Sequence, residues 1–252
     1  MSSNAIPVRD VSSLECRTCG AGAPVDEHFC PNCSRILALG RHGDYFSFLG
    51  LPRALTIDTA DLDRRYRELS RKFHPDFYYN ATPTERLASL ERSSYLNDAV
   101  RTLRNAVTRI EHLLAIEGLP PAGSDTRPAG AHGPASGAAP ASGAVPPSLL
   151  EEVFALNEEL DEIREMRESG RSPQELAPRI AAAREPIEGR RVTHEAQLQD
   201  LSARWDAVRE TGSPDEKRAV LEALRERLLE RNYINNLLAT IDRESAHTGR
   251  DG

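Results

Sequence analysis

Apolar residues recur at every third or fourth position in two long blocks of the chain, residues 43–119 and residues 148–244. This period is typical of helices that bury one face. Strict alternation of apolar and polar residues, the pattern of a half-buried strand, is missing outside a short cysteine-bearing segment at residues 14–40. The pattern therefore predicts an all-α protein with a small N-terminal segment attached.

The block at residues 43–119 predicts an antiparallel helical hairpin. Its first helix opens at Asp58 or Thr59 as N-cap. One apolar stripe follows along that helix: Leu62, Tyr66, Leu69 and Phe73. The helix must stop at His74, because Pro75 lacks an amide donor and disfavours helical backbone in the residue before it. Residues 74–76 then form an exposed turn.

A second long helix, from about Thr84 to Leu103, is expected to pack back against the first. The residues available for this contact are Leu87, Leu90, Leu96, Ala99, Val100 and Leu103. Two short helices flank the hairpin. Residues 44–52 predict a helix that Gly50 ends, and residues 109–116 predict a fourth helix.

The block at residues 148–244 predicts an antiparallel three-helix bundle. The core stripe of its first helix is Leu149, Val153, Leu156, Leu160 and Ile163. The second helix runs from about Glu175 to Val208, and Pro178 and Pro186 should shorten or kink its first half. The third helix opens at Ser213-Pro214 and carries Leu221, Leu224, Leu228, Tyr233, Leu237 and Ile241.

The first helix of this bundle carries a second ridge, about 100° or more away from its core stripe at about 100° per residue. The ridge holds Leu150, Phe154, Glu158 and Glu162 at a spacing of four. Its two apolar residues have no core to enter. The spacing therefore predicts an exposed surface that is partly apolar and partly acidic.

The two blocks are separated by residues 120–147, where Ala, Pro, Gly and Ser fill 23 of 28 positions. This composition buries too little apolar surface to offset the entropy lost when a backbone is ordered. We therefore expect a flexible, partly extended linker that lets the two halves move independently.

The net charge is −7, so the molecule as a whole should repel a phosphate backbone, and nucleic-acid binding is not expected. Residues 64–73 of the first hairpin helix have the opposite sign, with five basic residues against Glu68 alone: Arg64, Arg65, Arg67, Arg71 and Lys72. No apolar run approaches the roughly 18 residues of a membrane span. The first fifteen residues lack a signal core and an Arg-rich transit pattern, so the expected location is a reducing cytoplasm.

The four cysteines form two C-x-x-C pairs ten residues apart: Cys16, Cys19, Cys30 and Cys33. Each pair can hold one side of a tetrahedral ion, so the spacing predicts a closed, structural Zn²⁺ site, with iron in a rubredoxin-like site as the alternative. Two disulfides are disfavoured in a reducing compartment, and a thioredoxin-like redox pair would need a βαβ pattern that is absent. No catalytic residue is predicted, because no Ser or Cys nucleophile is patterned beside His74.

The sequence of the first block resembles the J-domain, and more narrowly the HscB-type co-chaperones. The matching stretches are DYFSFLGLP, RYRELSRKFHPD and YLNDAVRTLRNAVTRIEHLLAIEGL. The resemblance implies that His74, Pro75 and Asp76 engage a DnaK- or HscA-type chaperone and stimulate its ATPase. It also implies that the basic helix holds an acidic surface of that chaperone through Arg64, Arg67, Arg71 and Lys72. Phe77 departs from the family, where many members have lysine.

The resemblance resumes in the second block, where it implies binding of an IscU-type iron–sulfur cluster scaffold protein. The positions that match this surface are Leu150, Phe154, Glu158, Glu162 and Tyr233. Two positions depart from it, because Glu151 is acidic where an apolar residue is usual and Ala155 is small where an acid is usual. The alternative is that Phe154 and Tyr233 simply close the bundle.

These features predict an adaptor that is not itself an enzyme and that supports iron–sulfur cluster assembly. One alternative is a general J-protein that delivers unfolded clients through its bundle. Another is a zinc-dependent nucleic-acid or redox protein. The role of the cysteine segment stays open between contact with the partners and formation of a homodimer.

Overall fold

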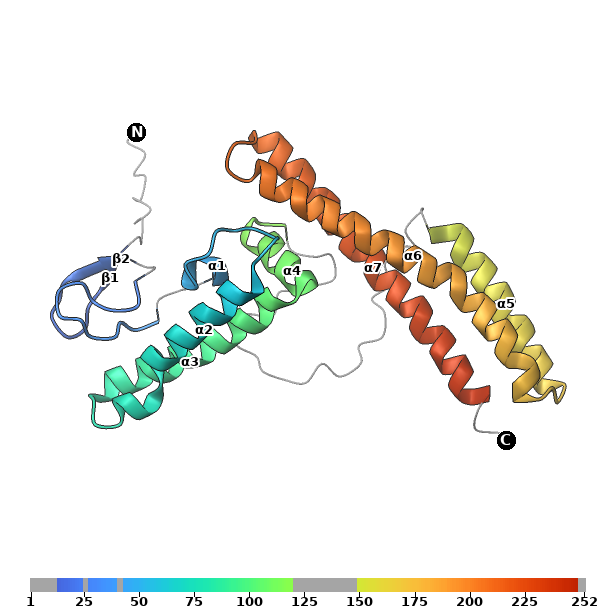
Figure 1. Ribbon diagram of the computed structural model, residues 1–252, viewed down its shortest axis with the longest axis horizontal. Coiled ribbons are helices and arrows are strands. Elements are labelled where there is room, and N and C mark those ends of the chain that lie inside the picture. The colour runs from blue at the N-terminus through green and yellow to red at the C-terminus, as the bar shows by residue number, and fades with distance from the viewer. Residues whose placement is uncertain (1–12, 25–26, 40–42, 120–148, 249–252) are drawn as a thin grey trace, which may run out of the picture. The chain divides into compact units, whose positions relative to one another are not determined.

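The computed structural model describes residues 13–24, 27–39, 43–119 and 149–248. Within these ranges the chain is mostly helical, and every described residue before Tyr45 lies outside a helix (Figure 1). It divides into two compact units, the first ending at His112 and the second beginning at Leu113. The predicted linker at residues 120–147 and the first twelve residues lie outside the described ranges.

The N-terminal unit opens with the only strands among the described residues. Strand β1, Ser13–Glu15, pairs antiparallel with β2, Gly22–Pro24, so that Leu14 lies opposite Ala23. The short helix α1, Tyr45–Phe48, follows the cysteine segment. Gly50 ends it with a φ of 63°, a left-handed backbone that glycine adopts without steric cost.

The predicted hairpin is confirmed. Helix α2, Thr59–Phe73, begins after Asp58, whose carboxylate accepts a hydrogen bond from the Ala60 amide. A 3₁₀ turn, η1, spans Pro75–Tyr78 and leads to helix α3, Pro83–Arg104. Helix α4, Ala106–Ile116, begins three residues before the predicted Arg109, and the division between the two units falls inside it.

The prediction that Leu87 and Leu90 pack into the hairpin is wrong, because 53% and 56% of their surfaces are exposed. The buried stripe of α3 takes a neighbouring face, through Ala88, Arg92, Leu96, Ala99 and Leu103. A helix with a narrow partner buries one stripe, and residues about a quarter turn away face solvent. Leu87 and Leu90 therefore form exposed apolar surface on α3.

The second unit confirms the all-α bundle, with helices α5, Leu150–Glu168, α6, Pro173–Val208, and α7, Pro214–Thr248 (Figure 1). All five residues of the predicted α5 core stripe are buried, in one cluster with residues of α6 and α7. Because α5 is about half as long as its partners, it covers only one end of the α6–α7 pair. The other end is a two-helix hairpin around buried Leu198, Trp205 and Leu224.

Of the two effects expected from the prolines of α6, shortening or a kink, the shortening is wrong, because this helix runs without interruption from Pro173 to Val208. Pro178 and Pro186 lie inside it, and both are exposed. An interior proline leaves the carbonyl four residues earlier without its amide partner, and on a solvent face water can satisfy that carbonyl. The start is set by Ser172, whose amide donates to the Glu175 carboxylate over 2.9 Å.

Candidate functional site

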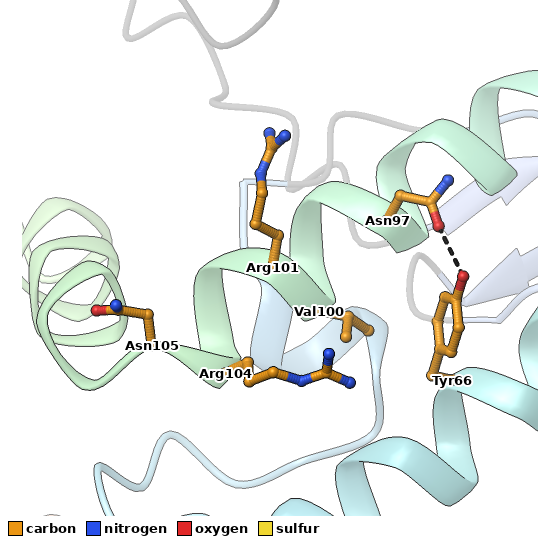
Figure 2. A pocket seen from close by; sticks show the side chains of 6 residues that line it. All are labelled: Tyr66, Asn97, Val100, Arg101, Arg104 and Asn105. Carbon is orange, nitrogen blue, oxygen red and sulfur yellow. Dashed lines mark hydrogen bonds between the residues drawn. The ribbon is translucent and has the colours of Figure 1, made fainter. Parts of the chain in front are cut away.

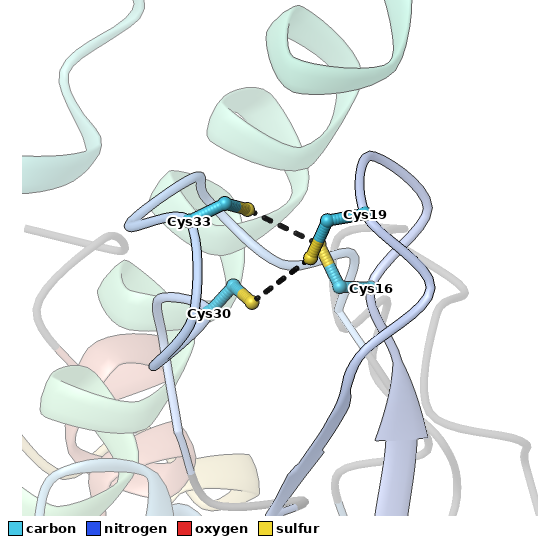
Figure 3. A group of neighbouring side chains, drawn as sticks. All are labelled: Cys16, Cys19, Cys30 and Cys33. Atoms are coloured by element: carbon cyan, nitrogen blue, oxygen red, sulfur yellow. Dashed lines mark hydrogen bonds between the residues drawn. The ribbon is translucent and has the colours of Figure 1, made fainter.

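The four cysteines meet at one point, although they come from two separate loops (Figure 3). Their Sγ atoms all lie within 4.8 Å of one another, with Cys16 3.6 Å from Cys33 and Cys19 3.7 Å from Cys30. Sulfurs bound 2.3 Å from one zinc ion would be about 3.8 Å apart. The donor set therefore fits a tetrahedral metal ion, and all four thiols are free of disulfides.

The thiols differ in how readily they ionise. A backbone hydrogen bond at Ala21, together with the Asn32 amide, lowers the pKa of Cys19 to about 6. Although a backbone hydrogen bond at Arg35 acts in the opposite direction, desolvation and the neighbouring thiols raise the pKa of Cys33 to about 12. Metals bind thiolates, so the lowered pKa of Cys19 favours metal binding, whereas the raised pKa of Cys33 means that a metal has to displace its proton.

The His-Pro-Asp tripeptide lies where the sequence predicts it, at the tip of the α2–α3 hairpin. His74 ends α2, and its Nδ1 accepts a hydrogen bond from the Asp76 amide over 3.3 Å. The Asp76 side chain is 86% exposed and its Oδ2 lies 3.5 Å from the same Nδ1. Phe77 is also exposed. The loop thus presents an imidazole, a carboxylate and a phenyl ring to solvent.

Hydroxyl groups form hydrogen bonds between this loop and helices α2 and α3 of the hairpin. The Phe73 carbonyl, which helix α2 leaves without a helical partner, accepts hydrogen bonds from the hydroxyls of Ser89 (2.6 Å) and Ser93 (3.0 Å) on α3. The Tyr78 hydroxyl donates to the Lys72 carbonyl over 3.0 Å. These contacts fix the loop backbone at its first stem, where the chain leaves α2.

The basic residues of α2 fall into two groups. Arg64 is paired with Asp61 and with Glu68 (3.1 Å), and Arg65 donates to Asp61 and to backbone carbonyls at Leu49 and Gly50. Three more are exposed and have no ion-pair partner among the described residues: Arg67, Arg71 and Lys72. The unpaired positive charge is therefore gathered in the half of α2 that leads into the His-Pro-Asp tripeptide.

An open hollow lies farther along the hairpin, between α2 and α3 (Figure 2). Its lining is Tyr66, Asn97, Val100, Arg101, Arg104 and Asn105. The Tyr66 hydroxyl donates to Asn97 Oδ1 over 3.1 Å, and both arginines pair with aspartates. None of the predicted site residues lines this hollow, and its polar groups are already partnered.

The ridge predicted on α5 is exposed. Phe154 is 70% exposed and Leu150 is 39% exposed, and Glu158 also faces solvent. Glu162 lies one turn farther along and is bonded to Arg179 of α6 over 2.6 Å. The apolar end of the ridge is thus open, whereas its acidic end also ties α5 to α6.

Tyr233 of α7 has a mixed position, because it is half-buried and packs against the core cluster of the bundle. For Tyr233, the alternative that it closes the bundle therefore holds at least in part. For Phe154 it does not hold, since a ring with most of its surface in water contributes little to a core.

Arg92, a fully buried arginine on α3 that bonds to the cysteine segment, was not predicted from the sequence. The sequence does indicate that Arg92 lies on the buried face of α3, because it is four residues from both Ala88 and Leu96. A charged residue type at that position is normally assigned to the surface, and the period alone was not enough to override it.

No protein-family model matches the sequence. Among solved structures, the chain is similar to the human co-chaperone protein HscB, with 23% identity and a TM-score of 0.56 over 92% of this chain and 98% of that one. The chain has the HscB fold. The HscB chaperone from Vibrio cholerae also aligns, with 21% identity and a TM-score of 0.49 over 81% of this chain and 98% of that one. The HscB fold agrees with the hairpin, the bundle and the four-cysteine cluster described above.

Proposed function

We propose that this protein is a J-domain co-chaperone of iron–sulfur cluster assembly, which stimulates the ATPase of a DnaK- or HscA-type chaperone and catalyses no reaction itself. The observation that carries the proposal is the exposed His-Pro-Asp tripeptide at the tip of a helical hairpin, directly after the unpaired cations of α2. The HscB fold, which aligns over 92% of this chain, supports it.

The loop and α2 have separate roles in this proposal. Arg67, Arg71 and Lys72 steer and hold an acidic surface of the chaperone, a contribution that weakens with salt. Arg64 joins them at the edge of that surface, less strongly because acidic neighbours already pair with it. His74, Pro75 and Asp76 then deliver the signal for hydrolysis, because their turn is fixed at its stem and exposed at its tip.

The bundle holds the cargo, an IscU-type scaffold protein. Leu150 and Phe154 offer an apolar surface with Glu158 and Glu162 beside it, and Tyr233 completes it from α7. A large exposed ring on a rigid helix is a favourable anchor for a partner protein.

The chain would then consist of four parts: the tetracysteine segment at residues 14–40, the J-domain at 43–119, the linker at 120–147 and the scaffold-binding domain at 148–244. The metal of the first part is structural Zn²⁺, because four sulfurs leave no open coordination position. The free thiols fit a reducing cytoplasm.

The test is ATP hydrolysis by the chaperone from the same cell, with and without the scaffold protein. We expect His74→Gln to abolish the stimulation and to leave scaffold binding intact. The matched control is His247→Gln, the same change at an exposed histidine near the end of α7. If the wild-type protein gave no stimulation, or if His74→Gln stimulated as well as wild type, the proposal would be wrong. Equal binding to denatured proteins would favour the general J-protein instead.

A further inference from the structure

The guanidinium of Arg92, on α3, forms hydrogen bonds to the cysteine segment. Its Nε donates to the Leu37 carbonyl over 2.8 Å, and its Nη1 donates to His28 Nδ1 over 2.7 Å. Weaker bonds of 3.4 and 3.3 Å run from Nη2 to the carbonyls of Glu27 and Ala38. Burial lowers the pKa of Arg92 to about 10, which leaves it charged at neutral pH. A buried cation bonded mainly to one segment ties that segment firmly to α3.

The acceptors of Arg92 lie at the base of the hairpin that carries two of the thiols. The Leu37 amide donates to the His28 carbonyl over 3.0 Å, and Phe29 and Ile36 form the next bridge. The tip of this hairpin is the turn from Cys30 to Cys33, closed by a bond from the Cys30 amide to the Arg35 carbonyl. A metal ion that fixes the turn from Cys30 to Cys33 would therefore also fix the groups at the base of the hairpin that accept hydrogen bonds from Arg92.

The same hairpin touches the first stem of the loop that carries the His-Pro-Asp tripeptide, which we define as residues 74–82. Phe73 is the residue before His74. The centre of its ring lies 5.0 Å from the centre of the His28 ring and 6.0 Å from the centre of the Phe29 ring. The Arg92 guanidinium lies 5.7 Å from the centre of the Phe73 ring on α2. The first stem is thus packed against the cysteine segment.

The second stem is held as well. Arg35, directly beyond the cysteine turn, bonds to Glu85 Oε1 over 3.0 Å. The other carboxylate oxygen of Glu85 accepts from the Thr82 amide (3.1 Å) and hydroxyl (2.8 Å), which is the cap that starts α3. Residues 74–82 therefore run between two stems that both contact one small segment.

We propose that the tetracysteine segment braces the loop at residues 74–82 from both stems, and that Arg92 and Arg35 are the positioning residues through which it does so. The inference rests on the proposed function, because the loop is the part that would signal to the ATPase. When bound, the metal supplies a cross-link among the four thiolates. The segment is too small to keep its hairpin without that cross-link, so metal loss should loosen the loop 40 residues farther along the chain.

Hydrogen exchange on the full chain, measured by mass spectrometry, tests the brace without any partner. Three loop amides report on it, through bonds from Phe77 to the His74 carbonyl, from Tyr79 to Asp76 and from Ala81 to Tyr78. Removal of zinc with a chelator is expected to speed exchange in peptides covering residues 74–82 by about tenfold or more, and to leave α5 unchanged. Faster exchange confined to residues 14–40 would overturn the proposal.

Arg35→Ala separates the brace from metal binding, because more than half of the Arg35 side chain is exposed and no thiol is changed. We expect the variant to keep its zinc and to show the same acceleration in residues 74–82. Arg17→Ala, at an exposed arginine of the same segment, is the matched control and should exchange like wild type. Arg92→Lys, which keeps the charge and loses the planar fork, should act in the same direction as Arg35→Ala. Wild-type exchange in Arg35→Ala would overturn the proposal.

ATPase assays keep the brace and the proposed function apart. We expect zinc removal and Arg35→Ala each to reduce stimulation several-fold, alongside the change in loop exchange. If His74→Gln abolished stimulation while Arg35→Ala and zinc removal left both stimulation and loop exchange unchanged, only the brace would be refuted. If the wild-type chain did not stimulate at all, the proposed function would be refuted, and loop exchange would still decide the brace.

Discussion

Phe154 and Leu156 lie two residues apart on α5 and face different surroundings, since Phe154 is 70% exposed and Leu156 is 4% exposed. The helical period predicts this difference from the sequence, because two residues correspond to about 200° of rotation. Truncation of a buried core residue should lower the free energy of unfolding. Truncation of an exposed binding residue should instead lower the affinity for a partner, so the two roles can be told apart.

We expect Phe154→Ala to weaken scaffold binding by about tenfold or more while the melting temperature stays near wild type, because the ring contributes to a partner surface and not to the core. Leu156→Ala is the matched control. It should lower the free energy of unfolding by about 2–5 kcal/mol, through a cavity in the bundle. Binding by titration calorimetry and melting by circular dichroism measure the two effects. A loss of stability in Phe154→Ala comparable to that in Leu156→Ala would show that Phe154 closes the bundle.

Single positions also show where sequence reasoning ends. His74, Pro75 and Asp76 could be placed at an exposed turn, because proline alone dictates where α2 stops. The contacts of Arg92 could not be predicted, because its partners lie more than 50 residues away in sequence and most are backbone carbonyls that carry no residue-specific signal. Leu87 and Leu90 were misplaced because an apolar residue type does not say which of two adjacent helix faces is covered.

Among the elements, α6 departs most from what its sequence predicts. Two prolines would ordinarily break a helix at a cost of about 3 kcal/mol each. The helix persists because its buried face, which includes Leu176, Ile180 and Ile187, packs into the bundle on both sides of each proline. Tertiary packing therefore outweighs local propensity here.

Because Pro186 lies in the interior of α6 with an exposed ring, we expect Pro186→Ala to raise the free energy of unfolding by about 1–3 kcal/mol. The substitution restores one backbone hydrogen bond to the Ala182 carbonyl and relieves the ring's clash with it. Pro173→Ala, at the first position of the same helix, is the control and should change stability little, since no helical bond is missing there. Urea unfolding followed by circular dichroism measures both. Destabilisation by Pro186→Ala would mean that the proline sets a bend that the packing of α6 requires.

Over the molecule as a whole, the sequence predicts the helical hairpin, the bundle and the cysteine cluster, because each depends on a local period or spacing. The docking of the cysteine segment on α3 was not predicted, since it depends on long-range contacts of Arg92 and Arg35. Those contacts connect the four-cysteine segment to the loop that we propose signals to the ATPase, two parts that the sequence pattern alone presents as separate.

The proposed adaptor needs its two activities in one chain, because a tether raises the effective concentration of the cargo near the chaperone to the millimolar range. His74→Gln should bind the scaffold without stimulating, and Phe154→Ala should stimulate without the added effect of the scaffold. We therefore expect an equimolar mixture of the two variants to lack scaffold-enhanced ATP hydrolysis, although each function is present in the tube. Recovery of the wild-type rate in the mixture would contradict a tether acting within one chain. Such recovery, lost on dilution, would instead point to a homodimer that shares its loops and bundles between copies.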